Sequence, residues 1–398
     1  MSWTGGVMRI LIVGAGIAGP TLAYWLLQAG HEPTLVERAP ELRRGGYLVD
    51  FWGAGFDVAE RMGIVPELRR RGYAFTEGRA VGPDGRRIGS VKTSAIMGAV
   101  EKYVSIARTD LAAVIYTALQ DRVDLLLDDT VARLEQDEHE VRVVFASGGE
   151  RTFDLVIGAD GLHSRVRRLA FGPDAGAEKY LGIVIAAYES RGYGFRDDLV
   201  ALMYAEVGFQ AVRVSLREDR TMFVLSVRHD GPLPPDDPAA QQALLRDRLA
   251  GAGWEVPAML AEMSRADTFY FDAASQIRLP SWSRGRVGLV GDAAACPSFL
   301  AGQGSALAMV ESYVLAAELC RSNDHRAAFA RYHEMLAPLI RSKQDAAMSL
   351  GTAFAPKNRR QLFVRNAAMR MMGLPKVADL VMGRSFRDAI ELPEPAAA

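Results

Sequence analysis

The sequence has few of the residues that mark disulfide-rich, metal-binding or redox-dithiol proteins. Only two cysteines occur in 398 residues, Cys296 and Cys320, and no C-x-x-C pair is present. Their scarcity excludes a dithiol centre and a zinc knuckle, and it is typical of a reduced, cytoplasmic protein. The six histidines form neither a metal-ligand spacing nor a Ser-His-Asp arrangement, so we expect no metal ion.

An excess of charge and long hydrophobic runs are also missing. Lys and Arg total 47 against 48 Asp and Glu, which leaves a net charge of -1. Such a balance gives no general attraction to nucleic acid or to an anionic membrane. The apolar stretch at residues 10–27 is interrupted by glycines and lacks a signal-peptide cleavage site, and no other stretch is long enough to span a bilayer. We expect a small-molecule partner, no membrane span, and a monomer or homodimer.

The stretch from Arg9 to Arg38 predicts a strand, a glycine-rich turn, a helix and a second strand. The turn has the pattern G-x-G-x-x-G, with Gly14, Gly16 and Gly19 around Ala18. The glycines allow a tight turn, a close approach of a pyrophosphate to the backbone, and close packing of the helix on the strand. Glu37 ends the second strand, where its carboxylate can accept from ribose hydroxyls and would repel a 2′-phosphate. This predicts FAD or NAD in this position and disfavours NADP.

Two later turns follow the same scheme. Asp160-Gly161 comes after an apolar strand and is followed by a basic residue, Arg165. Asp292 comes after another buried strand and precedes a glycine-rich loop that opens a long helix. The donors of that loop are at Gly302, Gly304 and Ser305. Each turn can present a carboxylate or backbone N–H groups to a polyhydroxy, phosphorylated ligand.

Together, the three turns resemble those of the single-component (group A) FAD-dependent aromatic hydroxylases, the p-hydroxybenzoate-hydroxylase-like family. The likeness spans about residues 9–380 and is strongest to tetracycline-modifying and antibiotic-tailoring monooxygenases. It implies a resident FAD, a transient NADPH or NADH, and O2. The implied reaction is hydroxylation of an apolar, aromatic or polyketide-like small molecule through a flavin C4a-hydroperoxide.

The resemblance also implies roles for individual residues, although it assigns no catalytic acid or base. The glycine turn would hold the ADP half, Asp160 would contact both FAD and NAD(P)H, and Arg165 would be a further NAD(P)H contact. The segment 45–50 would pass near the flavin. The remaining implied FAD contacts are Glu37, Arg38, Arg108, Gly161, Asp292, Gly302, Gly304 and Ser305.

One loop departs from the family pattern. Ala295 and Phe299 stand where the family usually has histidine and proline, while a proline occurs earlier, at Pro297. The family proline shapes the wall where oxygen meets the ring, so Phe299 is expected to face the substrate. This departure leaves open a second hypothesis, an FAD-binding tailoring enzyme that catalyses cyclisation or rearrangement without net redox change. A flavin halogenase is disfavoured because W-x-W-x-I-P is absent, and a non-enzymatic nucleotide-sensing module has no partner signal to support it.

The predicted fold class is α/β. A Rossmann-like FAD-binding domain of the glutathione-reductase βαβ type would carry an inserted antiparallel-sheet substrate domain, because hydrophobic periodicity changes to two between about residues 183 and 227. The helical C-terminus would follow. The predicted boundaries are 1–75, 101–177 and 270–325 for the FAD-binding domain, 76–100 and 178–269 for the substrate domain, 326–390 for the C-terminal helices, and 391–398 for a disordered tail.

The inserted sheet is expected to form the floor of the substrate pocket. The predicted pocket residues are Met203, Phe209, Arg213, Phe223, Pro297 and Phe299. The segment 358–372 mixes arginines with methionines and a phenylalanine, which is compatible either with an amphipathic packing helix or with a lid over the pocket.

Overall fold

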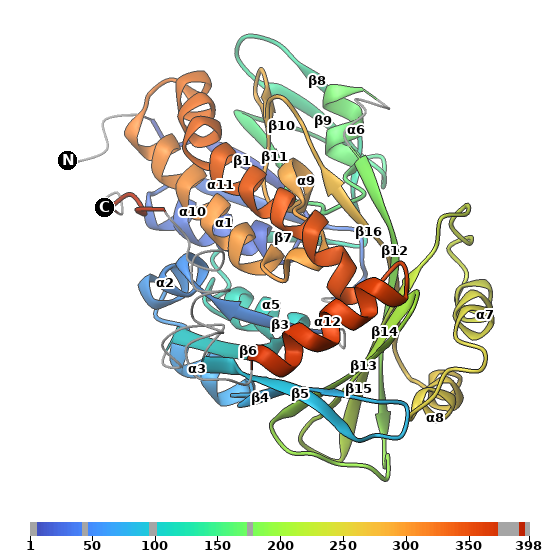
Figure 1. Ribbon diagram of the computed structural model, residues 1–398. Helices are drawn as coiled ribbons and strands as arrows, with labels where there is room; N and C mark the ends of the chain where they lie inside the picture. The colour runs from blue at the N-terminus through green and yellow to red at the C-terminus, as the bar shows by residue number, and fades with distance from the viewer. Residues whose placement is uncertain (1–5, 42–46, 95–101, 173–177, 373–389, 395–398) are drawn as a thin grey trace.

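A computed structural model describes residues 6–41, 47–94, 102–172, 178–372 and 390–394 (Figure 1). Its first layer is a six-stranded sheet, parallel except for the pairing of its first two strands. The predicted βαβ unit lies at the centre of this sheet, and the strands that deliver the two later turns are beside it. In spatial order, the strands are β17 (Ser283–Arg284), β18 (Val287–Leu289), β11 (Leu155–Gly158), β1 (Arg9–Val13), β2 (Glu32–Glu37) and β7 (Asp124–Leu127).

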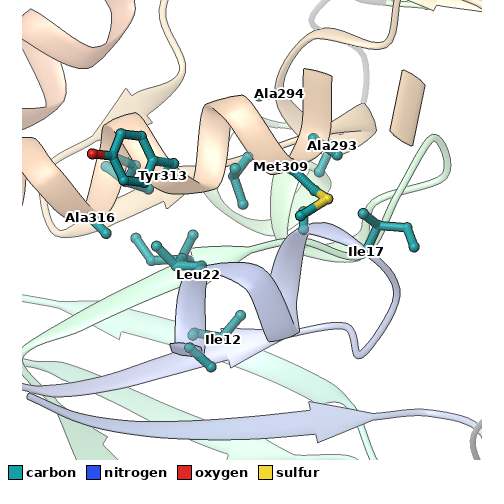
Figure 2. Close-up of a cluster of buried hydrophobic side chains, with 14 of the residues drawn as sticks. Ile12, Ile17, Leu22, Ala293, Ala294, Met309, Tyr313 and Ala316 are labelled. Atoms are coloured by element: carbon teal, nitrogen blue, oxygen red, sulfur yellow. The ribbon is translucent and has the colours of Figure 1, made fainter. Parts of the chain in front are cut away.

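Helix α1 (Ala18–Gln28) is buried between this sheet and the long helix α10 (Gly304–Arg321). Figure 2 shows Leu22 of α1 beside Met309 and Tyr313 of α10 in this interface. Apolar residues on both helices are fully buried, which fixes the glycine turn against the sheet. The other helices of this half are α2 (Ala54–Arg61), α3 (Val65–Arg71), α5 (Arg108–Thr117), α6 (Arg165–Phe171), α9 (Asp292–Ala295) and α11 (His325–Phe354), with a 3-10 turn at Phe299–Ala301.

The second layer is a seven-stranded sheet, which confirms the sheet-rich insertion. It is antiparallel except for one parallel pair, β13 with β4. Helices α7 (Pro238–Arg248) and α8 (Val256–Met263) lie at this sheet, and α12 (Arg359–Met372) contacts its edge strand β5 (Figure 1). In spatial order, the strands are β16 (Phe269–Ile277), β12 (Glu178–Arg191), β15 (Arg220–Arg228), β14 (Phe209–Ser215), β13 (Val200–Glu206), β4 (Glu77–Val81) and β5 (Arg87–Lys92).

Two small sheets complete the fold. One is three-stranded, and the other is a strand pair that leads into α5. Among the described helices, none is long and apolar enough to cross a membrane. The small-sheet strands are β10 (Glu150–Phe153), β9 (Val141–Phe145), β8 (Val131–Gln136), β3 (Leu48–Trp52) and β6 (Tyr103–Ala107).

Two predicted boundaries need correction. Strand β16 was assigned from residue 270 to the nucleotide domain, but it pairs with β12 in the seven-stranded sheet. Residues 391–394, expected to be disordered, pack on the first half of the molecule. Leu392 lies against its core, and the Pro393 carbonyl accepts from Arg61 at 2.7 Å and from Tyr313 at 2.5 Å. The predicted flavin-side glycines Gly45 and Gly46 lie outside the described residues.

Candidate active site

A cavity of about 1920 Å³ is lined by residues of both the six-stranded and the seven-stranded sheet. Drug-sized ligands occupy pockets of about 300–1,000 Å³, so this cavity has room for a dinucleotide and a second molecule. Residues of all three predicted ligand turns line it, together with one face of the seven-stranded sheet and one side of α12. The site is therefore shared by both halves of the molecule.

The glycine turn forms the cavity wall at the end of β1. Gly14 has φ +109°, a conformation that favours glycine, and its N–H donates to the Val36 carbonyl at 2.7 Å. A Cβ at Gly19 would lie 1.9 Å from the Gly14 carbonyl oxygen, so only glycine allows α1 to start this close to the turn. No side chain caps the N-terminus of α1. Its first backbone N–H groups therefore have no side-chain acceptor and are available to a phosphate.

Glu37 lies beside this turn at the end of β2. Its two carboxylate oxygens accept from the backbone N–H groups of Ala15 at 2.9 Å and Ala39 at 3.0 Å. These bonds fix the carboxylate against the glycine turn and leave further lone pairs for ribose hydroxyls. Arg38 is exposed at the rim of the same end of the cavity.

Arg108 and Asp292 reach the cavity from different elements. Arg108 begins α5, and its guanidinium lies beside the glycine turn. A Cβ placed on Gly16 would be 3.6 Å from Nη2 of Arg108. Asp292 begins α9 after Gly291, and both Arg108 and Asp292 line the cavity. Burial raises the pKa of Asp292, and the positive charge of Arg108 opposes that rise. The pair presents an anion-binding group and a hydroxyl-binding group to one ligand.

The second predicted turn is occupied by its own hydrogen bonds. The carboxylate of Asp160 accepts from the hydroxyl of Ser164 and from the backbone N–H groups of Arg165 and Val166, at 2.6 and 3.1 Å for the two N–H groups. Asp160 therefore caps α6 while it lines the cavity. The Arg165 side chain bonds to the carbonyls of Val131 and Ala132 and so ties α6 to β8. Both residues lie at the cavity wall with Gly161.

The third turn places an aromatic cluster at the junction of the two halves. Phe299 lines the cavity, and its ring lies 5.2 Å from that of Tyr47, whose ring lies 4.9 Å from that of Tyr270. Ser298, just before Phe299, has φ +88° and ψ 150°, a region that is costly for a residue other than glycine. No side chain caps α10, whose first residues Gly304 and Ser305 line the cavity with Gly302.

Four of the six predicted pocket residues are wrong. Met203 and Phe299 line the cavity, whereas Phe209, Arg213 and Phe223 lie on the opposite face of the seven-stranded sheet. Side chains alternate along a strand, so the cavity face carries the neighbours of these residues. That face consists of Ala201, Met203, Gln210, Val212, Val214, Met222 and Val224.

The misplaced residues have structural partners. Phe223 packs on Tyr188 and Tyr193, with ring centroids 5.4 and 4.9 Å apart. Arg213 forms ion pairs with Asp197 at 2.8 Å and Glu255 at 2.9 Å. Pro297, the remaining wrong prediction, is buried beside the loop, where its carbonyl accepts from Gln276 at 3.3 Å.

Sequence reasoning missed a contact that joins the two halves across the cavity. Nε2 of His163, next to the second turn, lies 3.2 Å from Oδ1 of Asp272 on β16, and both residues line the cavity. The hydrogen bond to Asp272 raises the pKa of His163. Asp272 belongs to no recognisable sequence motif. It could be identified only from the path of β16, which brings this residue to the cavity wall.

The fold and this cavity define a dinucleotide-binding enzyme whose cavity extends from the ligand turns to the apolar face of the seven-stranded sheet. A sequence model described as an FAD binding domain matches residues 7–340. The chain is 35% identical over 394 residues to a flavin-dependent monooxygenase from an unknown prokaryotic organism, covering 97% of this chain and 98% of that relative. It is 32% identical over 362 residues to a flavin-dependent monooxygenase of Legionella longbeachae serogroup 1 (strain NSW150), covering 88% and 90%.

Among solved structures, that of the tetracycline destructase Tet(55) matches with a TM-score of 0.83 and 33% identity over 98% of this chain and 99% of the other. The chain thus belongs to the FAD binding domain family, and it is an FAD-dependent monooxygenase. This confirms the resemblance, the cofactor and the enzyme class expected from the three turns.

Proposed function

We propose that this enzyme uses NAD(P)H and O2 to hydroxylate an apolar, aromatic or polyketide-like molecule. The overall change inserts one atom of O2 into the substrate, oxidises NAD(P)H to NAD(P)⁺, consumes one proton and releases the second oxygen atom as water. The observation that carries the proposal is the shared cavity, in which the nucleotide turns face an apolar sheet. The similarity to a tetracycline destructase supports a polycyclic substrate.

The residues at the turns fit FAD, and we assign them as follows. Backbone N–H groups at the start of α1 would bind the pyrophosphate, and Glu37 would bind the adenosine ribose. Arg108 would neutralise phosphate charge, and Asp292 would accept from ribityl hydroxyls. Arg38 and the loop donors at Gly302, Gly304 and Ser305 would complete the site, while Asp160 and Arg165 would meet the transient NAD(P)H. When bound, FAD supplies the hydride and oxygen chemistry.

The protein's contribution is orientation and the exclusion of water. Tyr47, Tyr270 and Phe299 form an aromatic wall where the loop of the third turn meets the seven-stranded sheet. Met203, Val212 and Val224 extend this wall with apolar side chains. A planar ring system can stack there while water is displaced.

The test is substrate-stimulated oxidation of NAD(P)H by the FAD-loaded protein under air, with a panel of polycyclic phenols and polyketides. We expect one or more compounds to accelerate NAD(P)H consumption and to gain one oxygen atom by mass spectrometry. Product formation without oxygen and without NAD(P)H consumption would instead establish the cyclisation or rearrangement hypothesis. A protein that binds no FAD would refute both.

A further inference from the structure

Arg365 of α12 brings a positive charge to the apolar part of the cavity. Its guanidinium donates to Gln210 Oε1 at 2.7 Å, to the Ala353 carbonyl at 3.0 Å and to Asn366 Oδ1 at 3.1 Å. Both Arg365 and Gln210 line the cavity. All three acceptors are neutral, so they orient the guanidinium without cancelling its charge.

No carboxylate of the described residues forms an ion pair with Arg365. Burial lowers the pKa of Arg365 to about 10, and no described acidic group opposes that effect. Glu77, the acidic residue that the seven-stranded sheet's β4 strand contributes to the cavity, already pairs with Arg79 at 3.3 Å and Arg87 at 3.4 Å. The charge of Arg365 therefore has no partner within the described protein.

Arg365 is half-buried, so its charge is only partly solvated. Met203 of the sheet packs in one cluster with Met369 of α12 and is paired with Val212, and all three line the cavity. A charge placed among apolar groups is stabilised by an opposite charge at hydrogen-bond distance. Arg213, on the other face of the same sheet, shows the alternative, because two carboxylates neutralise it.

We propose that Arg365, oriented by Gln210, is the specificity-determining residue of the substrate pocket, and that it selects an organic anion. The substrate would be an apolar ring system that carries an ionised oxygen, as a carboxylate or an enolate. This inference rests on the proposed function and narrows its substrate class. Gln210 and Val212 are successive cavity-facing residues of β14. Val212 is paired across the strands with Val224, and Val224 packs in one cluster with Phe299. An anion held at Arg365 would thus extend its ring toward the aromatic wall.

The experiment is calorimetric titration of the FAD-loaded protein with two probes of matched shape, anthracene-2-carboxylate and the neutral anthracene-2-carboxamide. Loading with FAD keeps the probes from the phosphate-binding arginines. We expect the carboxylate to bind at least about tenfold more tightly, since its hydrogen bond to Arg365 is charge-assisted on both sides and that of the carboxamide is not. Arg365→Met should remove this preference and leave carboxamide affinity unchanged.

Gln210→Glu provides a second, nearly isosteric variant if Arg365→Met fails to fold. It gives Arg365 an internal counter-ion, so it too should remove the preference for the carboxylate. Arg370→Met is the matched control, because Arg370 is on the same helix but is exposed and does not line the cavity. This control should retain the wild-type preference.

Equal affinity of the wild-type protein for both probes, or no detectable binding of the carboxylate, would overturn the inference. Loss of the preference in Arg370→Met to the same extent as in Arg365→Met would also overturn it, because the effect would then be nonspecific. NAD(P)H oxidation measured on the same preparations separates the two proposals. An anion preference that depends on Arg365 without stimulated oxidation by any compound supports this inference and counts against the hydroxylase.

Discussion

Gly16 and Gly19 belong to one turn but are constrained by different neighbours. A Cβ at Gly19 would clash with the Gly14 carbonyl at 1.9 Å, whereas a Cβ at Gly16 would meet only Arg108, at the ordinary distance of 3.6 Å. The space beside Gly16 belongs to the cavity and, in our assignment, to the pyrophosphate. A side chain at Gly19 should therefore impair folding, whereas a side chain at Gly16 should impair cofactor binding alone.

We predict that Gly16→Ala lowers FAD affinity at least tenfold without destabilising the apoprotein. Its free energy of unfolding should stay unchanged or rise by about 0.4–1 kcal/mol, because alanine restricts the unfolded chain. Gly19→Ala should lower both the unfolding free energy and flavin retention. Urea unfolding of the apoprotein and calorimetric titration with FAD test this, with Gly194→Ala as the control at an unobstructed glycine. Wild-type FAD affinity in Gly16→Ala would contradict our placement of the pyrophosphate.

Glu311 is a buried carboxyl behind the third turn. It accepts from the Gly291 N–H at 2.7 Å and from the Tyr332 hydroxyl at 3.3 Å. Burial raises its pKa to about 8. Between the pKa of the unfolded chain, about 4.3, and this value, the folded state keeps a proton that the unfolded state releases. The contribution of Glu311 to the free energy of unfolding must therefore fall as pH rises through that window, by at most about 1.4 kcal/mol per pH unit.

We predict that Glu311→Gln removes this pH dependence, because the amide can still accept from Gly291 but cannot ionise. The variant should gain stability relative to the wild type between pH 6 and pH 8, by on the order of 1–2 kcal/mol after allowance for local relaxation. Urea unfolding at a series of pH values measures the difference. Parallel stability curves for the two proteins would show that Glu311 does not titrate in this range.

Strands β13, β14 and β15 of the seven-stranded sheet have one face toward the cavity and the other toward a closed, aromatic-rich core. Met203 faces the cavity, while Phe223 is fully buried among aromatic rings on the other face. We predict that Met203→Ala changes ligand affinity severalfold with less than about 1 kcal/mol lost in stability, since the site is already partly open. Phe223→Ala should cost about 3–5 kcal/mol because it leaves a cavity in the core. Unfolding and ligand titration on both variants test the assignment of faces, and the reverse pattern would refute it.

The sequence predicted what local backbone requirements dictate. The glycine turn, the strand ends at Glu37 and Asp292 and the helix at Ser305 follow from spacing, because few residue types tolerate those conformations. Period-two hydrophobicity predicted a sheet but not which face meets the ligand, since both faces are largely apolar and large aromatics favour the closed core. Phe209 and Phe223 were misassigned for that reason.

Contacts between distant segments had no local signature. Arg365 meets Gln210 and His163 meets Asp272 only because α12 and β16 return to the cavity wall. Composition was misleading in the same way at the tail. The prolines and alanines of residues 391–398 suggested disorder throughout, but Leu392 meets the core. Such pairings depend on the path of the whole chain, which a linear pattern does not contain.

The C-terminal segment joins the last described residues to the first half of the molecule. The Pro393 carbonyl accepts from Arg61 of α2 and Tyr313 of α10, and the Glu394 carbonyl accepts from Arg321 at 2.9 Å. Tyr313 in turn packs on Trp25 of α1, with ring centroids 4.8 Å apart. The segment therefore bonds directly to α2 and α10, and Tyr313 extends that contact to α1, the helix that begins at the glycine turn.

We predict that deleting residues 391–398 lowers the unfolding free energy by about 1–3 kcal/mol, from the lost apolar burial and hydrogen bonds. FAD binding should weaken with it, because α1 and α10 carry the turn and the loop that form the cofactor side of the cavity. Deleting only residues 395–398 is the control and should leave both properties at wild-type values, since the contacts of Leu392 to Glu394 remain. Trp fluorescence during urea unfolding and FAD titration measure the two effects. Unchanged stability in the longer deletion would mean that the contacts of residues 392–394 do not stabilise these helices in solution.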